Sequence, residues 1–317
     1  MSRNHPSKDL NQRSQSMATS ARPQARRGPS GAWSRLKPVN IDPLDVYGLP
    51  SRGETRLHDY KVQESYYTKI VERYMKFCAS SGGGEELEKA FTALSLKGNP
   101  PEQTGGQDRP VLPRQISSTA RPNDMPNILM AMRKLREGIL GSRRRDNFAQ
   151  RAYMFIIHAS ILTGHWESYQ PALLYLLREI HPRTPLSLPE LQEFAGYRIL
   201  DLACRQYELM DAFAAKLAFN QNDRKVSAVL MALVHDDWVR FWRVKRAVDG
   251  YQRAIMEFAA ERMRLHALKC LGRGYMTADR AFVERTGDAS WPDLVKGGVG
   301  WQLQEGGSVL IRKPKAK

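Results

Sequence analysis

The chain has 317 residues, of which 42% are hydrophobic, and a chain of this size and composition can build one large core or two modest ones. Lys and Arg outnumber Asp and Glu by 49 to 33. The resulting formal net charge of +16 favours acidic partners such as RNA, DNA or acidic protein surfaces. No apolar run approaches the roughly eighteen residues of a membrane span, and residues 1–30 lack the apolar stretch of a secretory signal. This composition excludes a wholly disordered protein, and we expect no membrane partner.

The three cysteines predict free thiols rather than disulfides. Cys78, Cys204 and Cys270 are odd in number, lie far apart and have no C-x-x-C spacing. This usage is typical of small buried side chains in a reducing compartment. We therefore expect the protein in the cytoplasm, the nucleus or both.

Residues 1–58 are predicted to form a disordered basic tail. They mix Pro, Ser, Gly and Arg, and the first 40 contain eight Lys or Arg against the single acid Asp9. A mitochondrial presequence would share this acid-poor composition, but residues 1–30 contain too few large apolar residues for an amphipathic helix. One segment of the tail is expected to dock through the scattered apolar residues Trp33, Leu44 and Val46.

Residues 59–97 are predicted to form two N-terminal helices, and residues 98–124 a linker. Apolar residues recur at helical spacing from Tyr60 to Ala79. The Ser-Gly run that follows ends this helix before a second one over Glu85–Leu96. The linker is rich in Pro, Gly and Gln, so it buries too little apolar surface to offset the entropy of ordering it.

Residues 125–249 are predicted to form a helical-repeat domain. The clearest helix start is at Ser187, which together with Glu190 suits a reciprocal capping box, while Pro189 suits the first turn. Short connections favour antiparallel helix pairs, although no fixed period identifies a known repeat consensus. The apolar spacing predicts helices over 126–141, 146–164, 167–180, 188–206, 208–220, 223–235, 237–248 and 251–271.

Residues 250–317 are predicted to form a winged-helix domain, so the expected fold is all-α with a small C-terminal β-hairpin. A short strand over 275–277 and helices over 278–285 and 290–296 follow the first helix. The hydrophobic period then changes, and residues 299–312 alternate like a hairpin around a Glu-Gly-Gly turn. The hairpin is predicted to pack on the first helix, in a core formed by Trp301, Val309, Ile311, Ile255 and Met263.

Three stretches of the chain resemble one known family. They are Tyr153–Ser160 (YMFIIHAS) with Gly164–Tyr169 (GHWESY), then Phe241–Lys245 (FWRVK), then His266–Leu271 (HALKCL) ahead of the hairpin. The family joins a small subunit of the COP-nine signalosome, the small non-ATPase subunit of the proteasome regulatory lid, and subunit k of translation initiation factor three. The resemblance implies a non-catalytic, PCI-like protein whose helical repeat and winged helix serve assembly. A broader resemblance is to the Sac-three/GANP scaffolds of messenger RNA export.

The sequence contains no motif of a catalytic or metal site, so we expect no enzyme, no cofactor and no bound metal. G-x-S-x-G, G-x-x-x-x-G-K-[ST], G-x-G-x-x-G and H-E-x-x-H are all absent. His158 and His165 lie seven residues apart, but a core or capping role is favoured over metal ligation. Asp236 and Asp237 directly precede a predicted helix, which favours capping over acid–base chemistry.

The strongest candidate interaction surface is the helix over 237–248. Its aromatic residues cluster on one face and its basic residues lie elsewhere, which suits single-stranded nucleic acid. The favoured alternative is that the aromatics fill the joint between the helical array and the winged helix, while the Arg face meets solvent or an acidic neighbour. The residues concerned are Trp238, Phe241 and Trp242 on the aromatic face, Arg240 and Arg243 pointing away from it, and Arg246 flanking it, and the three arginines are the candidate interaction residues.

A second basic cluster, Arg143, Arg144 and Arg145, precedes the predicted helix start at Asp146. It forms either a docking patch or a solvated turn before the Asp146 cap, and the solvated turn is the more common arrangement. We list all three arginines as candidate interaction residues.

The sequence favours a non-enzymatic scaffold subunit of a multiprotein complex of the proteasome-lid, signalosome or initiation-factor type. Its partners would be the other subunits. The alternative is an RNA-associated adaptor in messenger RNA processing or export, which would bind RNA through the basic tail or the Arg faces. Sequence-specific DNA binding is not expected. The segment in the recognition-helix position, Ser290–Lys296, is short, contains Pro and is nearly neutral.

Overall fold

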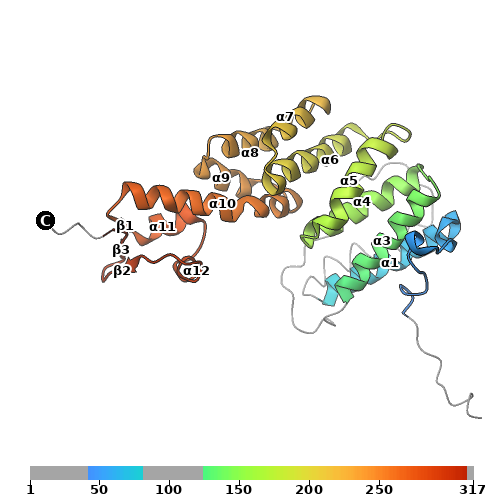
Figure 1. Ribbon diagram of the computed structural model, residues 1–317, viewed down its shortest axis with the longest axis horizontal. Coiled ribbons are helices and arrows are strands. Elements are labelled where there is room, and N and C mark those ends of the chain that lie inside the picture. Colours follow the sequence, from blue (N-terminus) through green and yellow to red (C-terminus); the bar gives the residue numbers. More distant parts are fainter. Residues whose placement is uncertain (1–41, 81–123, 313–317) are drawn as a thin grey trace, which may run out of the picture. The chain divides into compact units, whose positions relative to one another are not determined.

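The computed structural model describes residues 42–80 and 124–312 (Figure 1). These residues belong to one compact unit of the chain, which begins at Asp42. The basic tail up to residue 41, the predicted helix over 85–96 and the predicted linker up to residue 123 lie outside the described residues.

The fold is mostly helical with a small antiparallel sheet at its C-terminal end, which confirms the predicted fold class at this level (Figure 1). The first elements are η2 (Pro50–Arg52), η3 (Arg56–His58), α1 (Tyr60–Ser80), α3 (Asp124–Gly141), α4 (Asn147–Leu162), α5 (Trp166–Tyr175) and η4 (Leu176–Ile180). They are followed by α6 (Leu188–Leu200), η5 (Asp201–Gln206), α7 (Leu209–Ala218), α8 (Arg224–Val234), α9 (Trp238–Ala247) and α10 (Gly250–Gly274). The last elements are β1 (Thr277–Asp279), α11 (Arg280–Gly287), α12 (Trp291–Lys296), β2 (Gln302–Leu303) and β3 (Ser308–Leu310).

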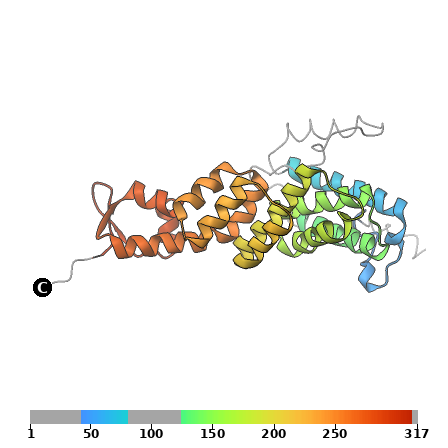
Figure 2. The ribbon, with the colours of Figure 1, turned by 90° about the horizontal axis from the view of Figure 1, so that it is seen from above.

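Every helix predicted between residues 126 and 271 is present, and consecutive helices lie side by side (Figure 2). Their starts follow from local chemistry. The carboxylates of Asp146, Asp223 and Asp249 each accept a hydrogen bond from a backbone N–H in the first turn. The predicted capping box is confirmed, with Glu190 accepting the Ser187 backbone N–H at 2.9 Å.

The helices α5 and α6 were predicted as continuous, but each ends in a π-helical turn, η4 and η5. The carboxylate of Asp201, at the start of η5, is fully buried and needs several donors. It accepts hydrogen bonds from Tyr169 Oη at 2.8 Å, Arg205 Nε at 2.6 Å and Gln206 Nε2 at 2.7 Å. In a π turn, residues five positions apart in the sequence lie next to each other. The Gln206 side chain therefore reaches the Asp201 carboxylate.

The chain is packed from Asp42 onward, so the predicted extension of the tail to residue 58 is wrong. Leu44 and Leu57 are buried, and the carbonyl oxygen of Leu44 accepts hydrogen bonds from Tyr66 Oη and Lys134 Nζ. The docked segment that was expected around Leu44 is therefore present. Val46, its expected neighbour in docking, remains exposed.

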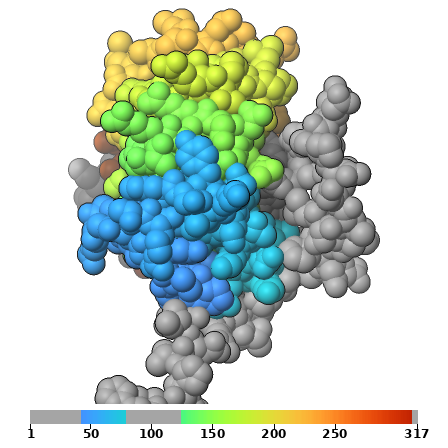
Figure 3. Space-filling model, turned by 90° about the vertical axis from the view of Figure 1, so that its right-hand side faces the viewer, coloured from blue at the N-terminus to red at the C-terminus, as the bar shows by residue number. Residues whose placement is uncertain are grey.

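The turn η3 lies directly on α3 because α3 has glycines at the contact. A Cβ atom at Gly138 would lie 2.6 Å from the Leu57 carbonyl oxygen, and one at Gly141 would lie 2.5 Å from His58 Nε2. The Gln63 side chain bridges the contact by donating to the Leu57 carbonyl oxygen at 2.8 Å. Figure 3 shows residues 42–80, in blue, lying against the green atoms of the following helices. The two glycines therefore determine how closely the turn η3 approaches α3.

The C-terminal sheet contains the predicted hairpin and a third strand. Its order is β1-β3-β2, with both pairings antiparallel. Val309 in β3 lies opposite Ala278 of β1 and Leu303 of β2, and it is fully buried. Gly306 and Gly307 have φ values of 91° and 82°, a conformation that glycine adopts readily and that the predicted turn requires.

The described residues form two hydrophobic cores, and α10 contributes to both. The smaller core holds Trp301, Val309 and Ile311 together with the last turns of α10. Ile255 and Met263 belong instead to the main core with the preceding helices. The prediction that these five residues form one winged-helix core is therefore wrong. So is the predicted domain boundary at residue 250, because the first turns of α10 complete the core of the helical array.

Gly138→Ala should destabilise the protein, whereas Gly272→Ala should stabilise it. Alanine normally favours a helix over glycine by about 1 kcal/mol. At Gly138 a Cβ would meet the Leu57 carbonyl oxygen at 2.6 Å, and such overpacking costs about 1 to 3 kcal/mol. At Gly272 it would meet Trp301 at 3.7 Å, an ordinary contact. Urea unfolding measures both changes, and equal stability of the two variants would contradict the close packing of η3 on α3.

Candidate interaction surface

Helix α9 buries aromatic residues at the joint between the helical array and the C-terminal elements. Asp237 caps the helix by accepting the Arg240 backbone N–H at 2.9 Å. Phe241 and Trp242 are buried, and the Trp242 indole N–H donates to the carbonyl oxygen of Thr286 in α11 at 3.0 Å. The favoured interpretation, that the aromatic face fills this joint, is confirmed for Trp242, whereas Phe241 is buried in the main core.

The three arginines of α9 differ in whether they form an ion pair. Arg240, Arg243 and Arg246 are all exposed. Arg246 donates to Asp288 at 2.8 Å and so meets the acidic neighbour that the favoured interpretation allowed. Within residues 42–80 and 124–312, Arg240 and Arg243 form no side-chain ion pair. These two residues, called the α9 Arg pair below, are the part of the face that is open to a partner.

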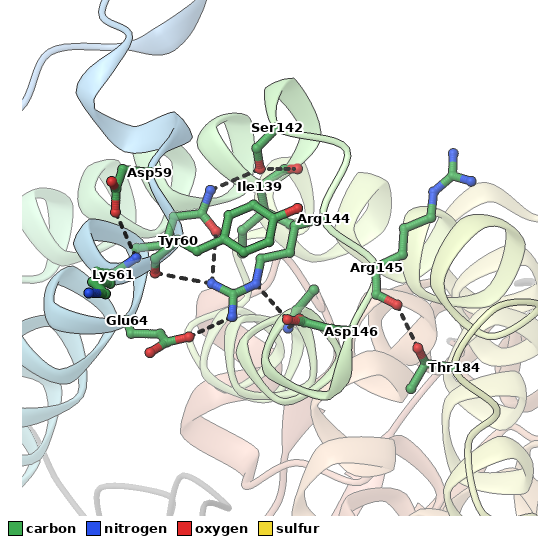
Figure 4. A network of polar contacts seen from close by, with 12 residues as sticks. Asp59, Tyr60, Lys61, Glu64, Ile139, Ser142, Arg144, Arg145, Asp146 and Thr184 are labelled. Carbon is green, nitrogen blue, oxygen red and sulfur yellow. Dashed lines mark hydrogen bonds and ion pairs between the residues drawn. The ribbon is translucent and has the colours of Figure 1, made fainter.

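Arg144 is buried and is not part of a docking patch, so this candidate was wrong. The residue is 4% exposed, and its guanidinium lies 4.3 Å from the ring centroid of Tyr60 and 4.2 Å from that of Phe148. It also forms ion pairs with Glu64 and Asp146, the latter at 2.8 Å (Figure 4). Two aromatic rings and two carboxylates thus surround the Arg144 guanidinium in place of the water that would surround an exposed arginine.

Arg143 and Arg145 remain closer to solvent. The Arg145 guanidinium lies 2.6 Å from the Glu179 carboxylate, and its backbone carbonyl oxygen accepts the Thr184 hydroxyl (Figure 4). Arg143 is exposed in the left-handed backbone region, with φ at 53°. Asp146 caps α4, as predicted, but the segment before it is solvated at Arg143 and not at Arg144. Among the three arginines, Arg143 is the exposed cation.

His158 takes a structural position, and His165 lies directly before a helix. His158 is buried, its ring centroid is 4.5 Å from that of Tyr251, and its Nε2 lies 2.9 Å from Glu193 Oε1. The predicted core role is confirmed for His158. His165 precedes α5, but its side chain makes no capping hydrogen bond. In the described part of the chain, no three His, Cys, Asp or Glu side chains are grouped so that they could hold a metal ion.

The cysteines are free thiols, as predicted. Burial raises the pKa of Cys78 to about 11 and that of Cys204 to about 12. Because the thiolate is the reactive form, both thiols are inert near neutral pH. Cys270 is partly buried, with its Sγ 3.4 Å from His266 Nε2.

The C-terminal elements expose apolar side chains that the sequence reasoning missed. The strands β1 and β2 are the two edge strands of the sheet. Met276 directly precedes β1, and Leu303 ends β2. The available signal was the apolar Tyr275-Met276 pair, which directly follows the end of α10. The exposed fractions are 47% for Tyr275, 49% for Met276, 46% for Val295 and 42% for Leu303. Met276 and Leu303 are called the edge residues below.

No family model matches the chain, and a search of curated proteins finds no match. The resemblance to the signalosome, lid and initiation-factor family therefore rests on residues of this chain alone. Of the helices that the structure describes, none is both long and apolar enough to cross a membrane.

Arg144→Ala should destabilise the protein by about 3 kcal/mol, because it removes two cation–π contacts and leaves the buried Gln63 side chain without the hydrogen bond from Arg144. Arg143→Ala, one residue earlier on the exposed side of the turn, should change stability by less than about 0.5 kcal/mol. Chemical denaturation of the two variants tests this difference. Equal effects would show that Arg144 is solvated, as the run of three arginines alone would suggest.

Proposed function

We propose that the protein is a non-enzymatic scaffold subunit of a multiprotein complex of the proteasome-lid, signalosome or initiation-factor type. We further propose that the elements from α10 to β3 form a winged helix and that the complex works in the cytoplasm or the nucleus. The resemblance of Tyr153–Ser160, Phe241–Lys245 and His266–Leu271 to that family supports the proposal.

The order of the C-terminal elements supports the winged helix. From α10 onward it runs helix, strand, helix, helix, strand, strand, and the sheet order β1-β3-β2 sets the first strand beside the last. The β2–β3 hairpin is then the wing. Helix α12 takes the position of a recognition helix, but it is six residues long and exposes both Asp293 and Lys296. This near-neutral surface favours a protein partner over a DNA groove.

The observation that carries the proposal is a small sheet, held firmly on a helical array, that has an exposed apolar side chain at each of its two edges. The edge residues Met276 and Leu303 are exposed apolar side chains beside the edge strands of the sheet. A partner that covers an edge strand would remove such a side chain from contact with water. The unit that bears them is joined to the array by the Trp242–Thr286 hydrogen bond and by Arg264 Nε, which donates to the Gly287 carbonyl oxygen at 2.7 Å. A partner bound there would be held in a fixed relation to the array.

Tagged full-length protein purified from its own cells should carry subunits of one such complex in near-stoichiometric amounts, identified by mass spectrometry. Changing both edge residues to Glu should remove these subunits, because two charges would be buried in the interface. Val239→Glu, at a residue that is 55% exposed on α9, is the matched control and should retain them. Absence of such subunits from the unmodified protein, or equal recovery with the edge variant, would refute the proposal.

An RNA-associated adaptor in messenger RNA processing or export is the second candidate function, and the α9 Arg pair favours it. Arg240 and Arg243 are exposed cations on one helix, and phosphate contacts need such groups. Arg246 is a poorer choice for a test, because its replacement would also break the contact to Asp288.

Changing the α9 Arg pair to Glu should weaken binding of single-stranded RNA roughly tenfold and reduce its dependence on salt. Arg143→Glu, at an exposed cation on another element, serves as the control in fluorescence anisotropy. RNA binding that survives the change to Glu but is lost on deleting residues 1–40 would place the contact in the basic tail. Such a result would exclude α9 as the RNA surface.

A further inference from the structure

A groove separates α7 from the end of α5 and its continuation η4. Its volume is about 380 Å³, within the range of roughly 300 to 1,000 Å³ that is usual for binding pockets. The groove is open because α7 lines it with Ala214, Ala215 and Ala218, whose short side chains leave the space unfilled. Leu177 and Leu202, both buried, supply apolar surface on the opposite side.

The helix that forms one wall of this groove also carries strongly exposed apolar side chains. Met210 and Leu217 are 82% and 81% exposed, and their spacing of seven residues places them on one face of α7. Leu188, at the start of the neighbouring α6, is 71% exposed. In the described part of the chain these are the most exposed large apolar residues. The presence of Met210 and Leu217 on the helix that lines the groove indicates a surface that a partner covers.

The groove has a cationic rim. Arg178 and Arg198 line it, and Arg178 forms no ion pair within the described ranges. Arg198 Nη1 is buried without a hydrogen bond, and its nearest carboxylate, Asp201 at 3.5 Å, is already occupied by Tyr169, Arg205 and Gln206. Burial lowers the pKa of the Arg198 guanidinium, and the nearby Arg178 charge adds to this.

Asp211 is the acidic side chain that lines the groove, and it offsets one of the two positive charges. Arg178 is exposed and has no ion pair in the described ranges, so it is the rim cation that a partner's carboxylate can reach. The net charge of +16 also argues against a second copy of this chain as the occupant, because two such chains repel each other.

We propose that the groove between α5–η4 and α7 binds an acidic amphipathic helix of a partner protein. Apolar side chains of that helix enter the groove beside Ala214 and Ala218, and its carboxylates reach Arg178. Met210 and Leu217 extend the apolar contact along α7. This surface lies on other elements than the edge residues and the α9 Arg pair, so the inference stands independently of the proposed function.

The test uses the full-length protein and a synthetic fluorescent peptide whose leucines repeat at helical spacing and whose remaining positions are Glu and Gln. The expected result is saturable binding in fluorescence anisotropy that weakens as salt is raised. Ala214→Phe fills the groove from an exposed position, and Arg178→Gln removes an exposed rim charge. Each should weaken binding about tenfold. Both positions are exposed, so circular dichroism should show an unchanged fold.

Matched controls separate this site from general basic attraction. Ala281→Phe on α11 and Arg273→Gln on α10 make the same chemical changes outside the groove and should leave binding unchanged. A peptide with Lys in place of Glu should not bind. Equal binding of the two peptides, no binding of the Glu peptide, or equal binding by the groove variants would each overturn the proposal. Sedimentation analysis that finds a dimer abolished by Ala214→Phe would overturn it too, by assigning the groove to a second copy of the chain.

Discussion

Helix α10 is the element on which the rest of the structure depends. Its 25 residues span roughly 37 Å, long enough to belong to two cores. Ile255, Met256 and Met263 pack with the array, whereas Leu268 and Leu271 pack under the C-terminal sheet. The buried side turns around the helix between these two regions, so α10 has no single apolar stripe. A continuous helix shared in this way ties the small sheet to the array, since neither core is complete without it.

The end of α11 strengthens this connection. The last carbonyl oxygens of a helix have no partner within it, and those of Thr286 and Gly287 accept hydrogen bonds from Trp242 of α9 and Arg264 of α10. Asp288, the next residue, lies 2.8 Å from Arg246. The alternation of aromatic and basic residues along α9 is thus explained in part by packing, because these side chains satisfy the end of a neighbouring helix.

The high positive charge of the chain is therefore only partly available to partners. Arg144 and Arg246 hold elements of the fold together, whereas Arg240, Arg243 and Arg178 are exposed without an ion pair in the described ranges. The exposed apolar residues named above lie in two places. The edge residues lie at the C-terminal sheet, and Met210 and Leu217 lie on α7. Two separate surfaces thus combine apolar exposure with positions that a partner can reach, which suits a subunit that contacts more than one neighbour.

The sequence by itself determined the helices, their caps and the C-terminal hairpin, because these depend on local spacing and on side chains that bond their own backbone. Asp146, Ser187 and Asp237 were identifiable as caps for this reason. The tertiary structure decided which charged residues are buried, where one core ends and the next begins, and where a groove opens. Arg144 is buried because Tyr60 and Glu64 approach it from a distant part of the chain. Such approaches depend on long-range packing, which the periodicity of a single segment does not specify.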